Sequence, residues 1–378
     1  MSKSPEEVPL SSPDITDHER QAVLAVLQTN RLSIGPRTVA FEQAVAARAG
    51  RQYGIAVNSG TSGLHLCVRA MGIGPGDEVV TTPFSFVATT NCLLFEGARP
   101  VFVDIDPDSY NMDPAAVEAA VTPRTKAILP VEVFGNMAHF DEYERIAERH
   151  GLMLLEDCCE ALGGRLGDRP AGSFGQCGVF AYYPNKQITT GEGGMIVTDS
   201  AEVRDLCASM RNQGRDTTEW LSHARLGYNY RLSDIASALG VSQMDRLDDI
   251  LRKRRDVAAR YHQALGGLDA VHLPPMSEPE QASWFVYVIR LADDFSQEQR
   301  DAVIARLKDD SVGCAPYFVP IHLQPYVVDT LGTRPGQFPL TEHVAARTLA
   351  LPFFAGLTEA QAARVAEALA GAIDAVRR

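Results

Sequence analysis

The chain begins with two stretches in which apolar residues recur every three or four positions. These stretches, residues 16–29 and 38–48, are predicted to be amphipathic helices. Their apolar faces consist of Val23, Leu24 and Leu27 in the first and of Val39, Phe41 and Val45 in the second. The segment Ser-Ile-Gly-Pro at 33–36 lies between them and is typical of a turn.

From about residue 53 the pattern changes to short apolar runs that alternate with helical stretches. This alternation predicts an α/β fold with a mostly parallel sheet that helices cover on both faces. Seven strands are expected, at residues 53–57, 78–82, 99–104, 126–131, 152–156, 179–182 and 195–198. The helices between them are expected at 61–70, up to 94, at 114–120 and at 140–149. In such a sheet, ligands bind at the carboxyl ends of the strands.

The last third of the chain predicts a smaller α+β unit. Residues 233–264 have the pattern of one long helix, from an N-cap at Ser233 to the Gly-Gly pair at 266–267. A strand at 284–291, a helix at 297–309 and a terminal helix at 358–377 follow. The chain is therefore predicted to form a large domain over 1–245 and a small C-terminal domain over 246–378.

Composition and charge narrow the classes of function. The 378 residues carry a net charge of −13, which disfavours broad nucleic-acid binding but not a small anionic ligand in a locally positive pocket. Seven cysteines without a CxxC pair indicate buried thiols in a reducing compartment, and no metal site is expected. The polar N-terminus and the lack of long apolar runs predict a cytoplasmic protein without a membrane span.

Three features at expected strand ends carry candidate chemistry. Asn58–Gly63 (NSGTSG) opens a helix, where backbone N–H groups can bind a phosphate, although an ordinary N-cap has the same pattern. Asp157 follows the run LMLLE, and an acid there lies over the ligand crevice or caps the next segment. Lys186 lies in the polar, glycine-rich loop YYPNKQITTGEGG between two strands. Pyridoxal phosphate requires these parts: a phosphate cradle, an acid for the pyridinium nitrogen and an amine.

With these residues the chain resembles the sugar aminotransferases of the DegT/DnrJ/EryC1/StrS family, which are fold type I pyridoxal-phosphate enzymes. The resemblance covers nearly the whole chain. It is densest in NSGTSGLHL, GPGDEVVTTPFSFVAT, FVDID, EDCCEALGG, FAYYPNKQITTGEGGM, GYNYRLSD and PIHLQPY. It implies a large domain with a mostly parallel seven-stranded sheet between helices, followed by a smaller domain.

The resemblance also implies roles for individual residues. Lys186 matches the lysine that binds the cofactor covalently, and Asp157 matches the acid that keeps the pyridine nitrogen protonated. The turn of Gly60, Thr61 and Ser62 matches the phosphate-binding turn. Phe86 matches the aromatic residue that stacks on the cofactor ring, although without the resemblance a core phenylalanine is the favoured interpretation. Asn229 matches an asparagine that reaches the phosphate of the neighbouring subunit, which implies a homodimer with shared active sites.

Two positions depart from the family pattern, and one separates its branches. Glu160 stands where Gln or His usually contacts the cofactor's 3-oxygen, and a carboxylate there repels a phenolate unless one of them holds a proton. Ala181 stands where many members have a phosphate-binding serine. The dehydratase branch replaces the covalent lysine with histidine, so Lys186 favours transamination.

The expected function is transfer of an amino group to a nucleotide-linked keto sugar in amino-sugar and polysaccharide biosynthesis. The donor is expected to be L-glutamate, with pyridoxamine 5′-phosphate as the form that carries the amino group. The resemblance is nearest to perosamine-synthase-like 4-aminotransferases and implies a 4-keto-6-deoxyhexose as acceptor. Glu192, Arg231 and His322 are candidate substrate residues, each with a surface or capping role as the alternative. A 3-keto sugar, another pyridoxal-phosphate reaction such as dehydration, and a non-catalytic regulatory protein remain the alternatives.

Overall fold

A computed structural model describes residues 7–216, 222–276 and 282–377, and its larger sheet has seven strands. Their order across the sheet is β1-β9-β8-β5-β4-β2-β3. They span β1 (Tyr53–Val57), β2 (Glu78–Thr81), β3 (Arg99–Phe102), β4 (Thr125–Leu129), β5 (Met153–Asp157), β8 (Cys177–Ala181) and β9 (Gly194–Thr198). All neighbouring strands are parallel except that β9 runs antiparallel to β1 and β8. The predicted α/β fold with a mostly parallel seven-stranded sheet is confirmed.

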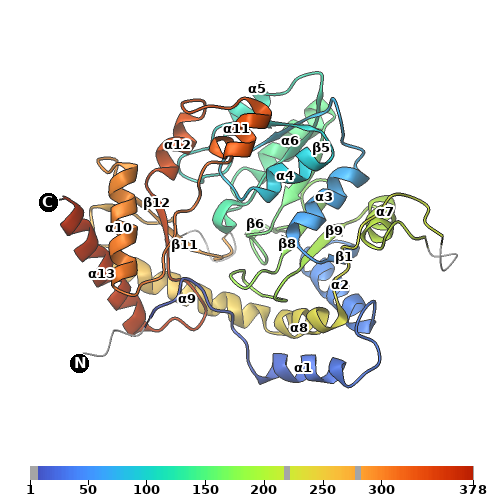
Figure 1. Cartoon of the computed structure of the whole chain (residues 1–378), viewed down its shortest axis with the longest axis horizontal. Helices are drawn as coiled ribbons and strands as arrows, with labels where there is room; N and C mark the ends of the chain where they lie inside the picture. The colour runs from blue at the N-terminus through green and yellow to red at the C-terminus, as the bar shows by residue number, and fades with distance from the viewer. Residues whose placement is uncertain (1–6, 217–221, 277–281, 378) are drawn as a thin grey trace.

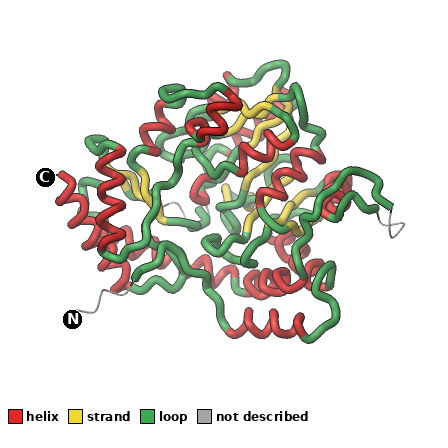
Figure 2. The backbone as a smooth tube through the Cα atoms, in the orientation of Figure 1, coloured by secondary structure: helices red, strands yellow, loops and turns green. Residues whose placement is uncertain are grey.

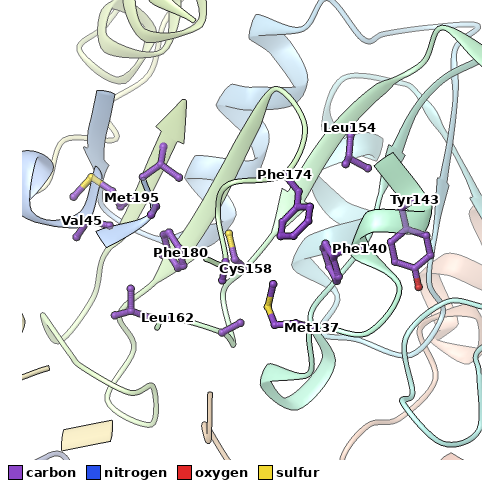
Figure 3. Packing of buried hydrophobic residues seen from close by; sticks show 14 of the residues in the cluster. Val45, Met137, Phe140, Tyr143, Leu154, Cys158, Leu162, Phe174, Phe180 and Met195 are labelled. Carbon is purple, nitrogen blue, oxygen red and sulfur yellow. The ribbon is translucent and has the colours of Figure 1, made fainter. Parts of the chain in front are cut away.

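Helices cover both faces of this sheet. Successive strand residues point to opposite faces, so apolar side chains of one strand pack against both helical layers. In β1, Ile55 and Val57 pack into a cluster with the helices of one face, and Ala56 packs into the cluster of the other. The first face carries α3 (Gly60–Ala70), α4 (Ala88–Phe95) and α7 (Ala201–Arg211). The second carries α2 (Pro36–Arg48), α5 (Pro114–Ala119) and α6 (Phe140–His150). Figure 3 shows the second cluster, in which Phe140 and Phe174 meet edge to face.

The strand directions bring several loops to one edge of the sheet. Six of the seven strands run the same way, so their carboxyl ends lie together. β9 starts at that edge, because Gly194 pairs with both Val57 of β1 and Ala181 of β8. The loop 182–193, which joins β8 to β9, therefore lies over the carboxyl ends of the neighbouring strands.

A smaller antiparallel sheet lies at the other end of the molecule (Figures 1 and 2). Its strands are β10 (Val271–His272), β11 (Tyr287–Leu291) and β12 (Thr348–Leu351). The helices α9 (Leu247–Leu265), α10 (Gln297–Asp309) and α13 (Glu359–Arg377) contribute to its apolar core. The remaining elements are α1 (Asp17–Leu27), β6 (Arg165–Leu166), β7 (Arg169–Pro170), α8 (Asp234–Asp245), α11 (Pro325–Leu331), α12 (Pro339–Ala345) and the 3-10 turns η1 (Val133–Gly135) and η2 (Ile321–Leu323). None of the helices in the described ranges is both long and apolar enough to cross a membrane.

Three details differ from the sequence-based expectations. The single helix predicted over 233–264 is two helices, because the backbone leaves helical geometry at Arg246 (φ −109°, ψ 6°), whose guanidinium binds Asp14 and Glu19. The strand predicted from 284 starts only at Tyr287. On the predicted apolar faces of α1 and α2, Leu24, Leu27 and Val39 are about half exposed instead of buried. The domain boundary near residue 245 stays a prediction.

Candidate active site

A cavity of about 480 Å³ lies at the carboxyl edge of the larger sheet. Residues that follow β1, β2, β5 and β8 line it, as expected for a ligand crevice in a sheet of this kind. Of the residues singled out in the sequence, the cavity lining includes Gly60, Thr61, Phe86, Asp157, Glu160, Lys186 and Glu192. Segments far apart along the chain thus supply one site.

Lys186 projects from the loop between β8 and β9 into this cavity. Its side chain is only 14% exposed, and its Nζ lies 3.6 Å from Oε1 of Glu160 and 3.8 Å from the ring centre of Phe285. The loop is held from within, since Thr190 N donates to Tyr182 O and Lys186 N donates to Tyr183 O. The backbone from which the amine extends is therefore held in place. The amine itself has one carboxyl group and one aromatic ring as neighbours.

Asp157 is the last residue of β5 and is buried at the floor of the cavity. Its Oδ2 accepts a hydrogen bond from Thr89 Oγ1 at 2.7 Å, and its Oδ1 accepts one from Cys159 N at 3.3 Å. Burial raises the pKa of this carboxyl, while these two donors and the Lys186 ammonium oppose the rise. A protonated ring nitrogen beside it would stabilise its charged form further.

Glu160 lies between Lys186 and a turn of the backbone. Its Oε2 accepts a hydrogen bond from Phe134 N at 2.9 Å, and its Oε1 faces Lys186. Burial raises the pKa of Glu160, and Lys186 is the main group that opposes this. Burial thus shifts this carboxyl towards its neutral form, which is the form that can donate to a phenolate.

The first turn of α3 faces the cavity and is a potential phosphate cradle. Ser59 caps the helix, since its Oγ accepts from Ser62 N at 3.1 Å. The N–H groups that start a helix have no partner inside it and lie at its positive end. Gly60 is required here, because a Cβ at this position would lie 2.8 Å from the Cβ of Ala181 and 2.9 Å from the Sγ of Cys159.

These parts fit pyridoxal 5′-phosphate as a donor set. Asp157 is a buried acid that no ion pair joins to a basic side chain among the described residues, which suits the pyridine nitrogen, and the start of α3 suits the phosphate. Lys186 supplies the amine within the same cavity. The ring of Phe86 lines the cavity with 62% of the residue exposed, so its face is accessible to a ligand.

Four of the predicted site residues lie outside the lining of this cavity. Ser62 is buried behind the turn, where its hydroxyl donates to Asn58. Asn229 is exposed on the far side of that turn. Arg231 donates to Asn212, and His322 is fully buried, with its Nε2 3.0 Å from Oε1 of Glu342. The substrate roles of Arg231 and His322 stay predictions.

Several lining residues were missed in the sequence. Thr89 is the second residue of α4, and its position offered no signal apart from being a hydroxyl after a strand. Phe285 and Tyr317 reach the cavity from the part of the chain that builds the smaller sheet. Their approach depends on tertiary packing, which no local pattern encodes.

Comparisons with known proteins agree with this geometry. The profile of the DegT/DnrJ/EryC1/StrS aminotransferase family matches residues 13–370. The GDP-perosamine synthase of Caulobacter vibrioides is 38% identical over 364 residues, which cover 96% of this chain and 97% of that protein. The structure of Helicobacter pylori PseC, an aminotransferase involved in the biosynthesis of pseudoaminic acid, superposes with a TM-score of 0.93 at 28% identity and covers 98% of this chain and 100% of its own. The PLP form of Spr1654 from Streptococcus pneumoniae gives a TM-score of 0.93 at 25% identity, with 98% of this chain and 100% of that chain covered.

Proposed function

The chain belongs to the DegT/DnrJ/EryC1/StrS aminotransferase family, and we propose that it transfers an amino group from L-glutamate to a nucleotide-linked 4-keto-6-deoxyhexose. It is a sugar aminotransferase that depends on pyridoxal 5′-phosphate, as its family and its structural neighbours are. The observation that carries the proposal is the meeting of Lys186, Asp157 and the start of α3 in one cavity. The sugar and the donor are the proposed refinements.

Each of these residues has a chemical task in the proposed reaction. When bound, the cofactor supplies an aldehyde that takes up the amino group and a ring that withdraws electrons from the reacting carbon. Lys186 would hold the cofactor covalently, and once released its amine would take the proton from the donor's α-carbon and return it to the C4′ carbon of the cofactor. Asp157 keeps the ring nitrogen protonated, and the N–H groups of Gly60 and Thr61 bind the phosphate.

Glu160 is proposed to donate a hydrogen bond to the cofactor's 3-oxygen. This role requires a proton on the carboxyl, and the buried position favours that protonated form. Its other oxygen is occupied by Phe134 N, so the carboxyl keeps a fixed orientation. The unusual residue at this position can therefore serve the same contact as the Gln or His that it replaces.

The acceptor is proposed from the likeness to GDP-perosamine synthase and from the open side of the cavity. Exposed lining residues Phe86, Tyr183 and Glu192 lie where a sugar could approach the amine. To test this, the enzyme is incubated with L-glutamate and with nucleotide-linked 4-keto-6-deoxyhexoses or 3-keto sugars, and the products are identified by mass spectrometry and NMR. We expect a 4-amino sugar only when L-glutamate is present. Deoxygenation without a donor, or amination at C3, would contradict the proposal.

A homodimer with shared sites is proposed on two further observations. Leu24, Leu27 and Ile34, from α1 and the segment that follows it, are 49–55% exposed, and a subunit interface would bury such apolar side chains. Asn229 lies outside its own chain's cavity, as a residue that serves a partner's phosphate must. The test mixes Lys186→Ala and Asn229→Ala chains, each expected to be impaired alone. A mixed dimer has one intact site, so activity should return on mixing; no recovery would refute shared sites.

A further inference from the structure

Arg254 is a buried cation that no ion pair joins to an acidic side chain within the described residues. It lies on α9 and is 3% exposed, and burial lowers the pKa of its guanidinium to about 10, which Asp14 opposes only in part. Among the described residues no ion pair joins it to a carboxylate, and its Nε has no hydrogen-bond partner. Burying an uncompensated charge costs free energy. The groups that the guanidinium does bind therefore indicate what the residue is for.

The terminal nitrogens of Arg254 bind three backbone carbonyls beside the active site. Nη2 donates to the carbonyl oxygen of Lys186 at 2.8 Å. Nη1 donates to the carbonyl oxygens of Phe285 at 3.1 Å and Trp284 at 3.5 Å. The Phe285 ring is also the surface above which Lys186 Nζ lies. One guanidinium thus fixes both the backbone from which the amine extends and the ring that it contacts.

Gln187 makes a second connection between the same segments. Its Nε2 donates to the backbone oxygen of Glu160 at 2.6 Å and to Ser283 Oγ at 2.9 Å. The lysine loop is therefore fastened to the segment before β11 at Lys186 itself, through Arg254, and at the next residue, through Gln187. The planar guanidinium suits this bridge, since it presents several donors in a fixed arrangement, which a lysine ammonium does not.

We propose that Arg254 is a positioning residue for Lys186, holding its backbone and the Phe285 ring in the relative placement that the amine needs to react. The inference rests on the proposed function of Lys186 and goes beyond it. Arg254 does not line the cavity and acts only through the two segments that it joins. A misplacement of about 1 Å can slow a reaction about 100-fold, so the effect should be large.

The test compares Arg254→Lys with Arg300→Lys. Arg300 is a matched control because it is also buried, at 4% exposure, and its Nη1 donates to the carbonyl oxygens of Ala345 and Thr348, which do not line the cavity. Apoenzyme is mixed with pyridoxal 5′-phosphate, and the covalent bond is followed by visible absorbance. In this step Lys186 Nζ bonds to the aldehyde carbon and the aldehyde oxygen leaves as water. Borohydride reduction and peptide mass spectrometry then confirm the site.

We expect Arg254→Lys to slow covalent capture about 100-fold and Arg300→Lys to leave it near the wild-type rate. Capture at the wild-type rate in Arg254→Lys, or equal slowing in both variants, would overturn the positioning role of Arg254 and leave the proposed function untouched. Failure of the wild type to form the bond would instead overturn the proposed function. If Arg254→Lys does not fold, Phe285→Leu takes its place, since the proposal requires slower capture there too, and an unchanged rate would refute it.

Discussion

The hydroxyl of Thr89 should set how strongly the protein binds its cofactor. Thr89 Oγ1 donates to Asp157 Oδ2 at 2.7 Å inside the protein, and this bond stabilises the carboxylate over the neutral acid. Thr89→Val keeps the shape and removes the donor. Hydrogen bonds to charged groups contribute about 1.5–3 kcal/mol, which corresponds to a roughly 10- to 100-fold weaker affinity for pyridoxal 5′-phosphate.

The next residue on α4 supplies a matched control. Thr90 is fully buried, but its hydroxyl has no hydrogen-bond partner in the part of the chain that the structure describes. Thr90→Val should therefore leave the affinity unchanged, and Thr89→Ser, which keeps a hydroxyl, should stay close to the wild type. The affinities are measured by titrating apoenzyme with the cofactor and recording its absorbance. Equal affinities for Thr89→Val and Thr90→Val at a pH below the pKa of the Asp157 carboxyl would refute the reasoning.

The pH dependence separates this electrostatic effect from a change in packing. Burial raises the pKa of Asp157, and loss of the Thr89 donor raises it further. At a pH below the pKa of Asp157 in both the wild type and Thr89→Val, the free carboxyl must lose its proton before it can hold the ring nitrogen. The variant then shows its full deficit in cofactor affinity. Above both values the carboxyl is already charged, and the deficit should disappear. A deficit that is constant with pH would point to packing instead.

Three further substitutions have defined outcomes. Gly60→Ala should weaken cofactor affinity in the same titration, because its Cβ would lie 2.8 Å from the Cβ of Ala181 and force the start of α3 away. Burial, together with the charge of Glu156, raises the pKa of Glu132. This carboxyl therefore destabilises the fold increasingly as the pH rises above about 4.3, which is its pKa in the unfolded chain. Glu132→Gln should raise the melting temperature more at pH 8 than at pH 5, and an equal change would contradict this. Burial alone would raise the pKa of Glu19, but its hydrogen bonds lower this pKa to about 2. Glu19→Gln should therefore be less stable than the wild type at pH 7, and the difference should vanish as the pH falls from about 4.3 towards 2. Urea unfolding at several pH values measures this difference.

The sequence predicted the larger sheet well because most of its strands are largely buried on both faces. Such strands read as continuous apolar runs, and all seven lie within a few residues of their expected bounds. The order of the strands was not predictable, since the insertion of β9 between β1 and β8 leaves no local signature. The break at Arg246 was missed for a related reason: helical periodicity continues through it, and its guanidinium is bound by residues of the N-terminal segment.

The site residues that directly follow a strand could be predicted from the sequence. The phosphate-binding turn, Asp157 and Lys186 each follow a strand, and the common direction of those strands places them together. Phe285 and Arg254 could not be found in this way, because each acts through contacts with a distant segment. The buried position of His322 likewise depends on packing against Glu342, which a pattern of residue types does not reveal.

The central claim is that Lys186 binds pyridoxal 5′-phosphate and exchanges it with an amino donor. The most direct measurement is the absorption spectrum of the protein with added pyridoxal 5′-phosphate, before and after L-glutamate, beside Lys186→Ala. We expect a visible band that bleaches with glutamate in the wild type and is missing in the variant. A wild-type protein without the band, or a variant that keeps it, would contradict the account.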